Sequence, residues 1–441
     1  MKFSLHIGAE ISLENFSLSQ LIQMIGKLFV DEGMPGLVKA FLSVIESLLV
    51  QSGVTCPHCK SDKAHSHTKQ ERKLYTSLGL MVFSMRRYRC QACKKTFVPL
   101  KSLLDVDQYS RKSREYEKLA LQQMTEESFR RSSKQLESTL GFKTPHTTLH
   151  GWFMKTPATN MSVRQRVDSI IADGTGYKMK HGPGESNRGE VRVVVGLTKE
   201  GEVVPFGAWT EASWKNIGKY IKSENHPSEK IKFNPIANTL ITDGEDELVR
   251  ALKKLAISHQ RCLFHMTHEL VPLLRYKDGT SKDEALQVSG ELNDLLYIEL
   301  PSMDVDPLKN LQHKLLIELK LKAAQTALDD FIKELHAMGY SKARNFVQNA
   351  KAQLFTYITN WIQHGITNPK VTSLVERMMR EIKRRIKKIG FGWSKKGAQR
   401  MTRLVLLQMS STKHKWETYW NEKMGIDSKI KLQFLGVTMT P

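Results

Sequence analysis

Two aspartates of this 441-residue chain stand where each could hold a metal ion, at the end of a predicted strand. An apolar run over residues 167–171 ends at Asp173, and a second over residues 239–242 ends at Asp243. A glycine follows each aspartate. If the two strands are neighbours in one sheet, both carboxylates project from the same edge. Carboxylates bind Mg²⁺ while leaving it several waters, and two ions about 4 Å apart can activate an attacking oxygen and stabilise a leaving one. The pair therefore indicates metal-assisted phosphoryl transfer, with capping of the next helix as the alternative role.

A third carboxylate is needed to complete such a site. The best candidate is Glu376, on a helix predicted over residues 372–388. Glu381 competes with it, but the two are five residues apart and do not share one helix face well. Three further acids crowd Asp243 and are expected in the first turn of the following helix, where they favour its N-terminus: Glu245, Asp246 and Glu247.

Four of the five cysteines form two CxxC pairs, Cys56 with Cys59 and Cys90 with Cys93. An odd, sparse count in a long chain argues against a disulfide framework. Four thiolates suit one tetrahedral Zn²⁺ ion. We therefore expect one structural zinc in a small β-rich module over residues 51–98, with four unrelated cysteines as the alternative.

The charge of the chain points to a polyanionic partner. The formal net charge is +22, and nucleic acid is the leading partner because Lys and Arg that neutralise phosphates release counterions; an anionic membrane surface is the rival. Only Glu381 opposes the basic side chains of segment 377–403. Trp393, in the same segment, could stack on an unpaired base or pack in the core, and the core is favoured. The basic residues expected to contact the DNA backbone here are Arg377, Arg380, Arg384, Arg385, Lys387 and Lys388, with Lys383, Lys395, Lys396, Arg400 and Arg403 in the same run.

A second DNA-binding candidate lies earlier in the chain. Residues 128–140, a turn at Gly141 and residues 144–152 have the pattern of a helix–turn–helix. An ordinary helical hairpin is the alternative. In the DNA-binding reading the second helix presents Thr147, Thr148 and His150 to the major groove, and Arg130 and Arg131 hold phosphates.

The sequence shows no run of about 18 apolar residues that would span a bilayer and no signal peptide. We therefore expect a protein of the cytoplasm, associated with the nucleoid of a prokaryotic cell, with no membrane partner.

Several short blocks, in this order, resemble the DDE transposases with a ribonuclease-H-like catalytic domain, especially the Mutator-like group and its bacterial insertion-sequence relatives. The group is similar in carrying a CxxH motif after the second Asp and a helical insertion before the final Glu. The resemblance covers roughly residues 165–410. The matching residues are Ala172-Asp173-Gly174-Thr175, Thr242-Asp243-Gly244, Gln260-Arg261-Cys262-Leu263-Phe264-His265 and residues 372–385.

This resemblance implies a function and a site. Asp173, Asp243 and Glu376 would hold two Mg²⁺ (or Mn²⁺) ions, with Cys262 and His265 supporting the site or its DNA contacts. Water would cleave double-stranded DNA at the ends of an insertion sequence, and the freed 3′-hydroxyl would attack target DNA. A homo-oligomer that holds both element ends is implied as well.

The expected fold is α/β, a ribonuclease-H-like catalytic domain with an all-helical insertion, preceded by a zinc ribbon and a helical, helix–turn–helix-like DNA-binding segment. Two other functions share these residues: a ribonuclease-H-like nuclease that cuts without strand transfer, and a domesticated, non-catalytic DNA-binding regulator. Along the chain we expect a helical lead-in (1–50), a zinc ribbon (51–98), a helical DNA-binding segment (99–160), the first part of the catalytic core (165–275), the insertion (276–368), and the second part of the core with the basic helix and tail (369–441).

Overall fold

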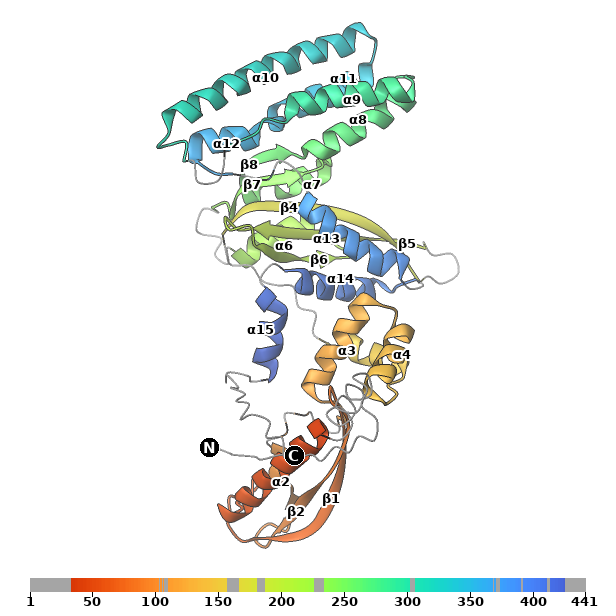
Figure 1. The fold of residues 1–441 in the computed structure, drawn as a ribbon, viewed down its shortest axis with the longest axis vertical. Coiled ribbons are helices and arrows are strands. Elements are labelled where there is room, and N and C mark those ends of the chain that lie inside the picture. The colour runs from red at the N-terminus through yellow and green to blue at the C-terminus, as the bar shows by residue number, and fades with distance from the viewer. Residues whose placement is uncertain are drawn as a thin grey trace, which may run out of the picture. The chain divides into compact units, whose positions relative to one another are not determined.

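The computed structural model describes residues 33–102, 104, 106, 110–156, 166–180, 187–225, 234–301, 306–367, 369, 373–389, 392–410 and 413–424. They form two compact units, one made of Met1–Phe153 with Trp420–Pro441 and the other of Met154–Tyr419. Figure 1 labels their elements.

The first unit begins with helix α2 (Met34–Gln51) and an antiparallel sheet of strands β1 (Ala64–Thr76), β2 (Gly79–Cys90) and β3 (Thr96–Phe97). Alternate residues of the β1–β2 hairpin point to one side and form a small apolar core, against which one side of α2 packs through Val38, Leu42, Ile45 and Leu49. By length and composition alone α2 is also apolar enough to cross a membrane, but Lys39 and Glu46 interrupt its apolar residues.

Three further helices follow in the chain: α3 (Arg114–Glu126), α4 (Phe129–Leu140) and α5 (His146–Lys155). The hydroxyl of Ser128 accepts a hydrogen bond from the Arg131 N–H and caps α4, which ends at Gly141 with a φ of 70°. The Thr144 hydroxyl, just before α5, forms a hydrogen bond with the Tyr116 hydroxyl at 2.6 Å.

The second unit is built on a five-stranded sheet in the order β6-β5-β4-β7-β8. Strand β5 is antiparallel to both of its neighbours, β4 and β6, whereas β4, β7 and β8 run parallel. Strand β8 has little apolar alternation and is absent from the sequence prediction. The bounds are β4 (Val167–Lys178), β5 (Arg188–Leu197), β6 (Val203–Trp209), β7 (Ala237–Thr242) and β8 (Ala256–Arg261).

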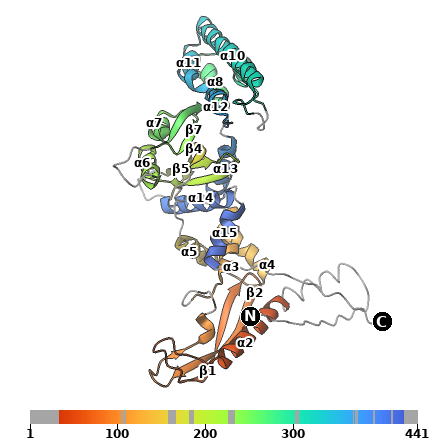
Figure 2. The ribbon, with the colours of Figure 1, turned by 90° about the vertical axis from the view of Figure 1, so that its left-hand side faces the viewer.

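Helices cover both faces of this sheet, so the expected mixed α/β class is confirmed. Helices α6 (Trp214–Asn225) and α7 (Asp246–Leu252) lie on one side, and α13 (Ser373–Lys383) lies on the other (Figure 2). Helix α14 (Lys395–Met409) contacts β5 and β6. Helix α15 (Lys413–Met424) follows α14 in the chain.

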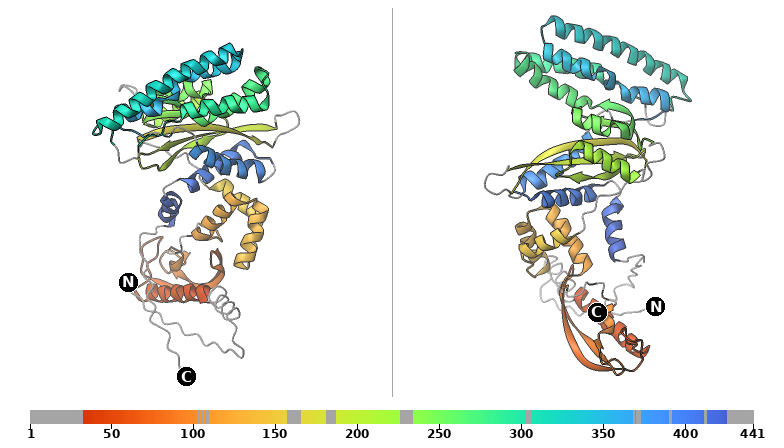
Figure 3. Two further views of the ribbon diagram at one scale, coloured as in Figure 1. Left: turned by 45° about the horizontal axis from the view of Figure 1, so that its top comes forward. Right: turned by 180° about the vertical axis from the view of Figure 1, so that it is seen from behind.

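Five consecutive helices form an insertion beside β8: α8 (Leu263–Lys277), α9 (Lys282–Leu296), α10 (Leu311–Ala337), α11 (Ser341–Leu354) and α12 (Thr356–His364). They have a hydrophobic core of their own. The buried Gln260 side chain joins the insertion to the sheet, because it accepts from the Tyr357 N–H at 2.8 Å and donates to the Leu354 carbonyl at 3.0 Å. Figure 3 shows α10 lying along the outer side of the insertion.

Candidate active site and nucleic-acid surfaces

Asp173 and Asp243 lie at the same level on neighbouring parallel strands. β4 and β7 pair Ile171 with Ile241, and the same sequence offset relates Asp173 to Asp243 two residues further on. Asp243 directly follows β7, as predicted. Asp173 does not end its strand, however, because β4 stays paired with β5 as far as Lys178. The two carboxylates are thus aligned by strand register and not by two coincident strand ends.

The Asp173 side chain belongs to the face of the sheet that α13 covers. Ile170 and Ala172 of β4 pack in the core with α6 and α7. Since successive side chains of a strand point to opposite faces, Ile171 and Asp173 point the other way. Helix α13 contacts β4, and it carries Glu376 in its first turn.

Burial raises the pKa of the Asp173 carboxyl, and the neighbouring Asp243 carboxylate raises it further. The positive charge of Lys383, the Gly174 N–H and His265 act in the opposite direction. The Gly174 N–H donates to Asp173 Oδ1 at 2.6 Å. Two carboxylates held together in a partly buried place repel each other unless a cation lies between them, so this arrangement fits a divalent metal.

Glu376 forms a close group with Cys262 and His265 and not with the two aspartates. One carboxylate oxygen of Glu376, the Cys262 sulfur and a His265 ring nitrogen all lie within 4.8 Å of one another. Among the described residues, the three carboxylates do not form a group this tight. The strand register brings the aspartates together, and α13 brings Glu376 beside the CxxH pair.

His265 interacts electrostatically with the two aspartates as well as with Cys262. Its hydrogen bond with Cys262 raises its pKa to about 9, and the charges of Glu269 and Asp243 act in the same direction. Cys262 is the buried N-cap residue of α8. At neutral pH the imidazole is therefore protonated and places a positive charge among the carboxylates.

Arg261 packs against the backbone beside Asp243, a contact that sequence reasoning missed. Gly244 has a φ of +93°, and a Cβ atom added to it would lie 0.7 Å from Arg261 Nη1. The Arg261 side chain is held by Glu269 at 3.7 Å and over the ring of Phe346 at 5.5 Å. The Asp-Gly pair in the sequence signals a turn but gives no sign of the arginine that fills the space.

Further acidic groups surround the Asp243 turn on the α6 side. The Trp214 indole N–H donates to Glu245 Oε2 at 3.1 Å. Burial raises the pKa of Glu245, and the negative charges of Asp243, Glu190 and Glu247 raise it further. Asp246 and Glu247 lie in the first turn of α7 as expected, whereas Glu245 precedes the helix.

The four paired cysteines gather at one point of the first unit. Cys56 and Cys93 are 3.6 Å apart between sulfurs, as are Cys59 and Cys90, and all four sulfurs lie within 4.8 Å of one another. Sulfurs at about 2.3 Å from a tetrahedral zinc lie roughly 3.8 Å apart. The Cys93 backbone N–H contributes most to lowering the pKa of Cys90 to about 7, which favours a thiolate.

The two cysteine turns have the same backbone geometry. Lys60 and Lys94, each directly after its CxxC pair, have φ values of 61° and 62°. Each N–H donates to the carbonyl of the first cysteine of its pair. This repetition gives two matching hairpin turns that present four sulfurs to one ion.

The basic segment after Glu376 divides into exposed and buried side chains. Arg377, Arg380, Lys387 and Lys388 are exposed. Arg384 is half-buried and pairs with Glu381 at 2.6 Å.

Arg385 corrects the sequence prediction of a DNA-facing role, whereas Trp393 takes the core position that the sequence analysis favoured over stacking on a base. Arg385 is 1% exposed. Its guanidinium lies 4.9 Å from the centre of the Trp393 ring and donates to the Ile389 carbonyl at 3.0 Å. Trp393 is buried as well. The chain turns through residues Arg384–Lys388 with π-helical geometry, which carries Arg385 inward.

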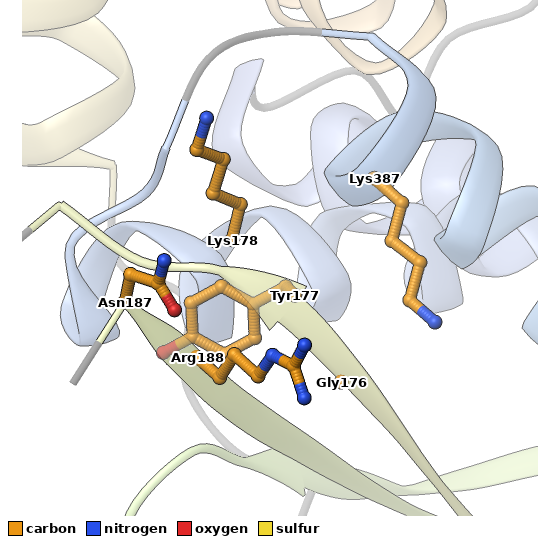
Figure 4. Close-up of a pocket in the computed structure, with 6 residues that line it drawn as sticks. All are labelled: Gly176, Tyr177, Lys178, Asn187, Arg188 and Lys387. Atoms are coloured by element: carbon orange, nitrogen blue, oxygen red, sulfur yellow. The ribbon is translucent and has the colours of Figure 1, made fainter.

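A cleft of about 410 Å³ opens where β4 ends and β5 begins, beside this turn (Figure 4). Lys178, Arg188 and Lys387 are among its lining residues. Figure 4 shows Arg188 on the strand pair and Lys387 on the helical turn. Three cations from three elements give the cleft the charge that a phosphate group requires.

The candidate recognition helix of the first unit keeps its polar residues accessible. On α5, Thr147, Thr148 and His150 are exposed, while Leu149 is buried. Arg130 and Arg131 are exposed at the start of α4. The arrangement leaves these side chains available to a nucleic acid.

Comparison with known proteins identifies relatives of this chain. Residues 298–418 match the family described as Transposase, Mutator family. Proteins from Staphylococcus aureus and Enterococcus faecalis, each named Transposase for insertion sequence element IS256 in transposon Tn4001, are 23% identical over 224 residues. The alignments cover 49% of this chain and 48% of each relative, so the chain spans about half the length of the curated relatives it matches. These findings confirm the resemblance found in the sequence: the chain is similar to the Mutator-family transposases of bacterial insertion sequences.

Proposed function

We propose that this protein is the DNA transposase of an insertion sequence, which cleaves the element ends and joins their 3′-hydroxyls to target DNA. The observation that carries the proposal is the alignment of Asp173 and Asp243 on adjacent parallel strands, on the sheet face covered by the Glu376 helix. The similarity to Mutator-family transposases supports it. Such an enzyme would act on chromosomal and element DNA in the cytoplasm of a prokaryotic cell.

The catalytic unit has the ribonuclease-H-like fold in this proposal. Three antiparallel strands followed by two parallel ones, in the order β6-β5-β4-β7-β8, support that assignment. The helices between β8 and α13 are then the insertion before the final glutamate. The four-cysteine module is a zinc ribbon, and α4 with α5 contacts DNA.

The chain's own groups divide the work of phosphoryl transfer. Asp173 and Asp243 supply oxygen ligands for two Mg²⁺ or Mn²⁺ ions, and Glu376 completes the second position. The ions supply Lewis-acid activation and neutralise charge at the reacting phosphate. Protonated His265 lies beside these acids and limits their repulsion. Basic side chains around the site hold the flanking phosphates in place.

The test is divalent-metal-dependent cleavage and strand transfer on a duplex that carries the inverted repeat flanking the gene. We expect Asp173→Ala, Asp243→Ala and Glu376→Ala each to abolish both reactions while DNA binding survives. Glu247→Ala and Glu381→Ala are the controls, because Glu247 is exposed on α7 and Glu381 pairs with Arg384.

Each outcome is informative. Near-normal cleavage by Asp243→Ala would refute the two-metal site. Loss with Glu381→Ala but not with Glu376→Ala would move the third ligand. Cleavage without joining would show a nuclease, and sequence-specific binding that needs none of the three acids, with no cleavage, would show a regulator.

A further inference from the structure

Helix α8 exposes a row of rings along one side. Phe264 is 43% exposed and Tyr276 is 72% exposed, and His268 and Pro272 between them are exposed as well. These four residues, which we call the ring row, recur at every fourth position and so fall within an arc of about 120°. Across the described residues, the exposed Phe, Tyr and Trp side chains all belong to the insertion: Phe264, Tyr276 and Tyr297.

The ring row lies opposite the side of α8 that packs in the insertion. Leu263, Met266, Leu270 and Leu274 are buried in the insertion core. By helical rotation their mean direction is about 175° from that of the ring row. The solvent-facing side of a surface helix is usually polar or charged, so the packing of the insertion does not explain these rings.

Pro272 is an unusual residue for its position. It stands inside α8, where a proline removes the hydrogen bond to the carbonyl four residues earlier, that of His268. Pro272 is exposed, so the insertion core gains no buried side chain from it. Its ring instead adds a flat apolar surface between His268 and Tyr276, which a role for the exposed side of α8 would account for.

The ring row begins beside the candidate active site. The Phe264 ring lies nearly parallel to that of His268, with ring centres 5.5 Å apart and an angle of 24°, and edge-on to that of His265 at 5.6 Å. A ring nitrogen of His265 lies within 4.8 Å of a Glu376 carboxylate oxygen. From Phe264 the row extends twelve residues to Tyr276, about 18 Å along the helix. A DNA strand that leaves the site along α8 would meet these rings in succession.

The charge on this side of α8 suits a polyanion. The other residues in the same arc are His265 and Arg275, and the Arg275 guanidinium lies 5.0 Å from the centre of the Tyr276 ring. The acid of α8, Glu269, falls outside the arc and pairs with Arg261 at 3.7 Å. Exposed rings with cations beside them are the combination that holds single-stranded nucleic acids, because the rings stack on bases and the cations contact phosphates.

We propose that the ring row binds unpaired DNA, with bases stacked on Phe264 and Tyr276 and phosphates beside Arg275. The ligand is a single strand of any sequence, because every base has a face that can stack. The biological setting rests on the proposed function, since cleavage at an element end would release a strand beside the catalytic acids. A duplex hides its base faces, so the ring row should contribute to single-strand binding and not to duplex binding.

Fluorescence anisotropy of the full-length protein tests the ring row, with an oligothymidine and a blunt duplex of equal length. Chelator is present throughout, so no cleavage occurs. Phe264→Ala and Tyr276→Ala should each weaken single-strand binding about fivefold or more and leave duplex binding unchanged. Phe264→Trp should bind the single strand as tightly as the wild type does, because it keeps a ring on which a base can stack.

Two control variants separate stacking from other effects. Leu286→Ala removes a side chain of similar exposure without a ring, on α9, and should change neither affinity. Lys277→Ala removes an exposed cation at the end of α8, outside the ring row, and should change both affinities by the same factor. Circular dichroism confirms that the variants fold.

Photo-cross-linking locates the contact. An oligothymidine that carries 5-iodouracil forms a covalent bond with an aromatic side chain on which that base stacks. Peptide mapping should find the bond at Phe264 or Tyr276, and cross-links confined to residues outside α8 would overturn the proposal.

Two binding results would overturn it as well. Unchanged single-strand binding by both alanine variants would leave the ring row to a protein partner. Equal losses of single-strand and duplex binding would exclude stacking, which acts on unpaired bases. None of these measurements requires cleavage, so their failure leaves the proposed reaction intact. A protein that binds single strands through the ring row but cuts no DNA would refute the reaction alone.

Discussion

Gly244→Ala is expected to destabilise the Asp243 turn through two separate effects. The φ of Gly244 is +93°, a conformation that costs a residue with a Cβ about 1–2 kcal/mol. The new methyl group would also lie 0.7 Å from Arg261 Nη1, so Arg261 must leave its position. Arg261 would then lose its pairing with Glu269 and its contact with Phe346, at roughly 1–2 kcal/mol more. The total loss in the free energy of unfolding is about 2–4 kcal/mol.

Gly279→Ala is the matched control. Gly279 has a φ of +83°, but nothing lies within 4 Å of the position that its Cβ would take. This variant should lose only the backbone contribution of about 1–2 kcal/mol. The difference between the two variants isolates the displacement of Arg261.

The assay is urea unfolding of the full-length protein in a double-mutant cycle with Arg261→Ala. In the Arg261→Ala background the methyl group has room, so Gly244→Ala should cost only the backbone contribution. We expect a coupling of about 1–2 kcal/mol between the two positions. If Gly244→Ala costs no more than Gly279→Ala, and Arg261→Ala does not change its cost, the inferred packing of Arg261 on this turn is refuted.

Three further predictions follow from the site and its surroundings. Burial and the Asp243 carboxylate raise the pKa of Asp173 above its ordinary 3.8. The neutral form of Asp173 therefore makes its full contribution to the free energy of unfolding below pH 3.8. This contribution is lost as the pH rises through the pKa that Asp173 has in the folded protein. Asp173→Asn should therefore raise the free energy of unfolding at pH 7.5 in chelator but not near pH 3.5, and a gain at both would contradict the pKa assignment. Elemental analysis should find about one zinc per chain in the wild type and in Cys262→Ser but not in Cys56→Ser, and zinc retained by Cys56→Ser would argue against the four-cysteine site. Lys387→Glu and Lys388→Glu should each weaken binding to all DNA sequences alike and reduce the slope of log affinity against log salt by about one. Arg385→Glu should instead lower the unfolding temperature. If Arg385→Glu protein folds normally and only binds DNA more weakly, Arg385 belongs to the DNA-binding surface after all.

Local sequence patterns predicted the elements that they specify directly. The apolar runs at residues 167–171 and 239–242 predicted β4 and β7. The helical pattern of residues 128–140 and the turn at Gly141 predicted α4 and its end. The paired cysteines predicted a four-sulfur cluster. Each of these depends on neighbours within a few residues, so the sequence alone contains the information.

Features that depend on distant partners were missed or mistaken. β8 has the sequence Ala-Ile-Ser-His-Gln-Arg, which lacks a strand pattern, and it is a strand because β7 and the insertion helices supply its partners. β4 extends past Asp173 because β5 continues to pair with it. Strand pairing is decided between segments far apart in the chain, and propensity has little influence on it.

For the candidate site, the sequence by itself determined which chemical groups are present: Asp173, Asp243, Glu376 and the CxxH pair. The tertiary structure alone decided their arrangement, with the aspartates aligned by parallel register and Glu376 placed beside Cys262. It also separated Arg384 from Arg385, adjacent residues of which the second is buried under Trp393. A charge count treats these two arginines alike, but burial depends on the direction in which each side chain leaves the backbone and on what packs there, and only the folded chain fixes both.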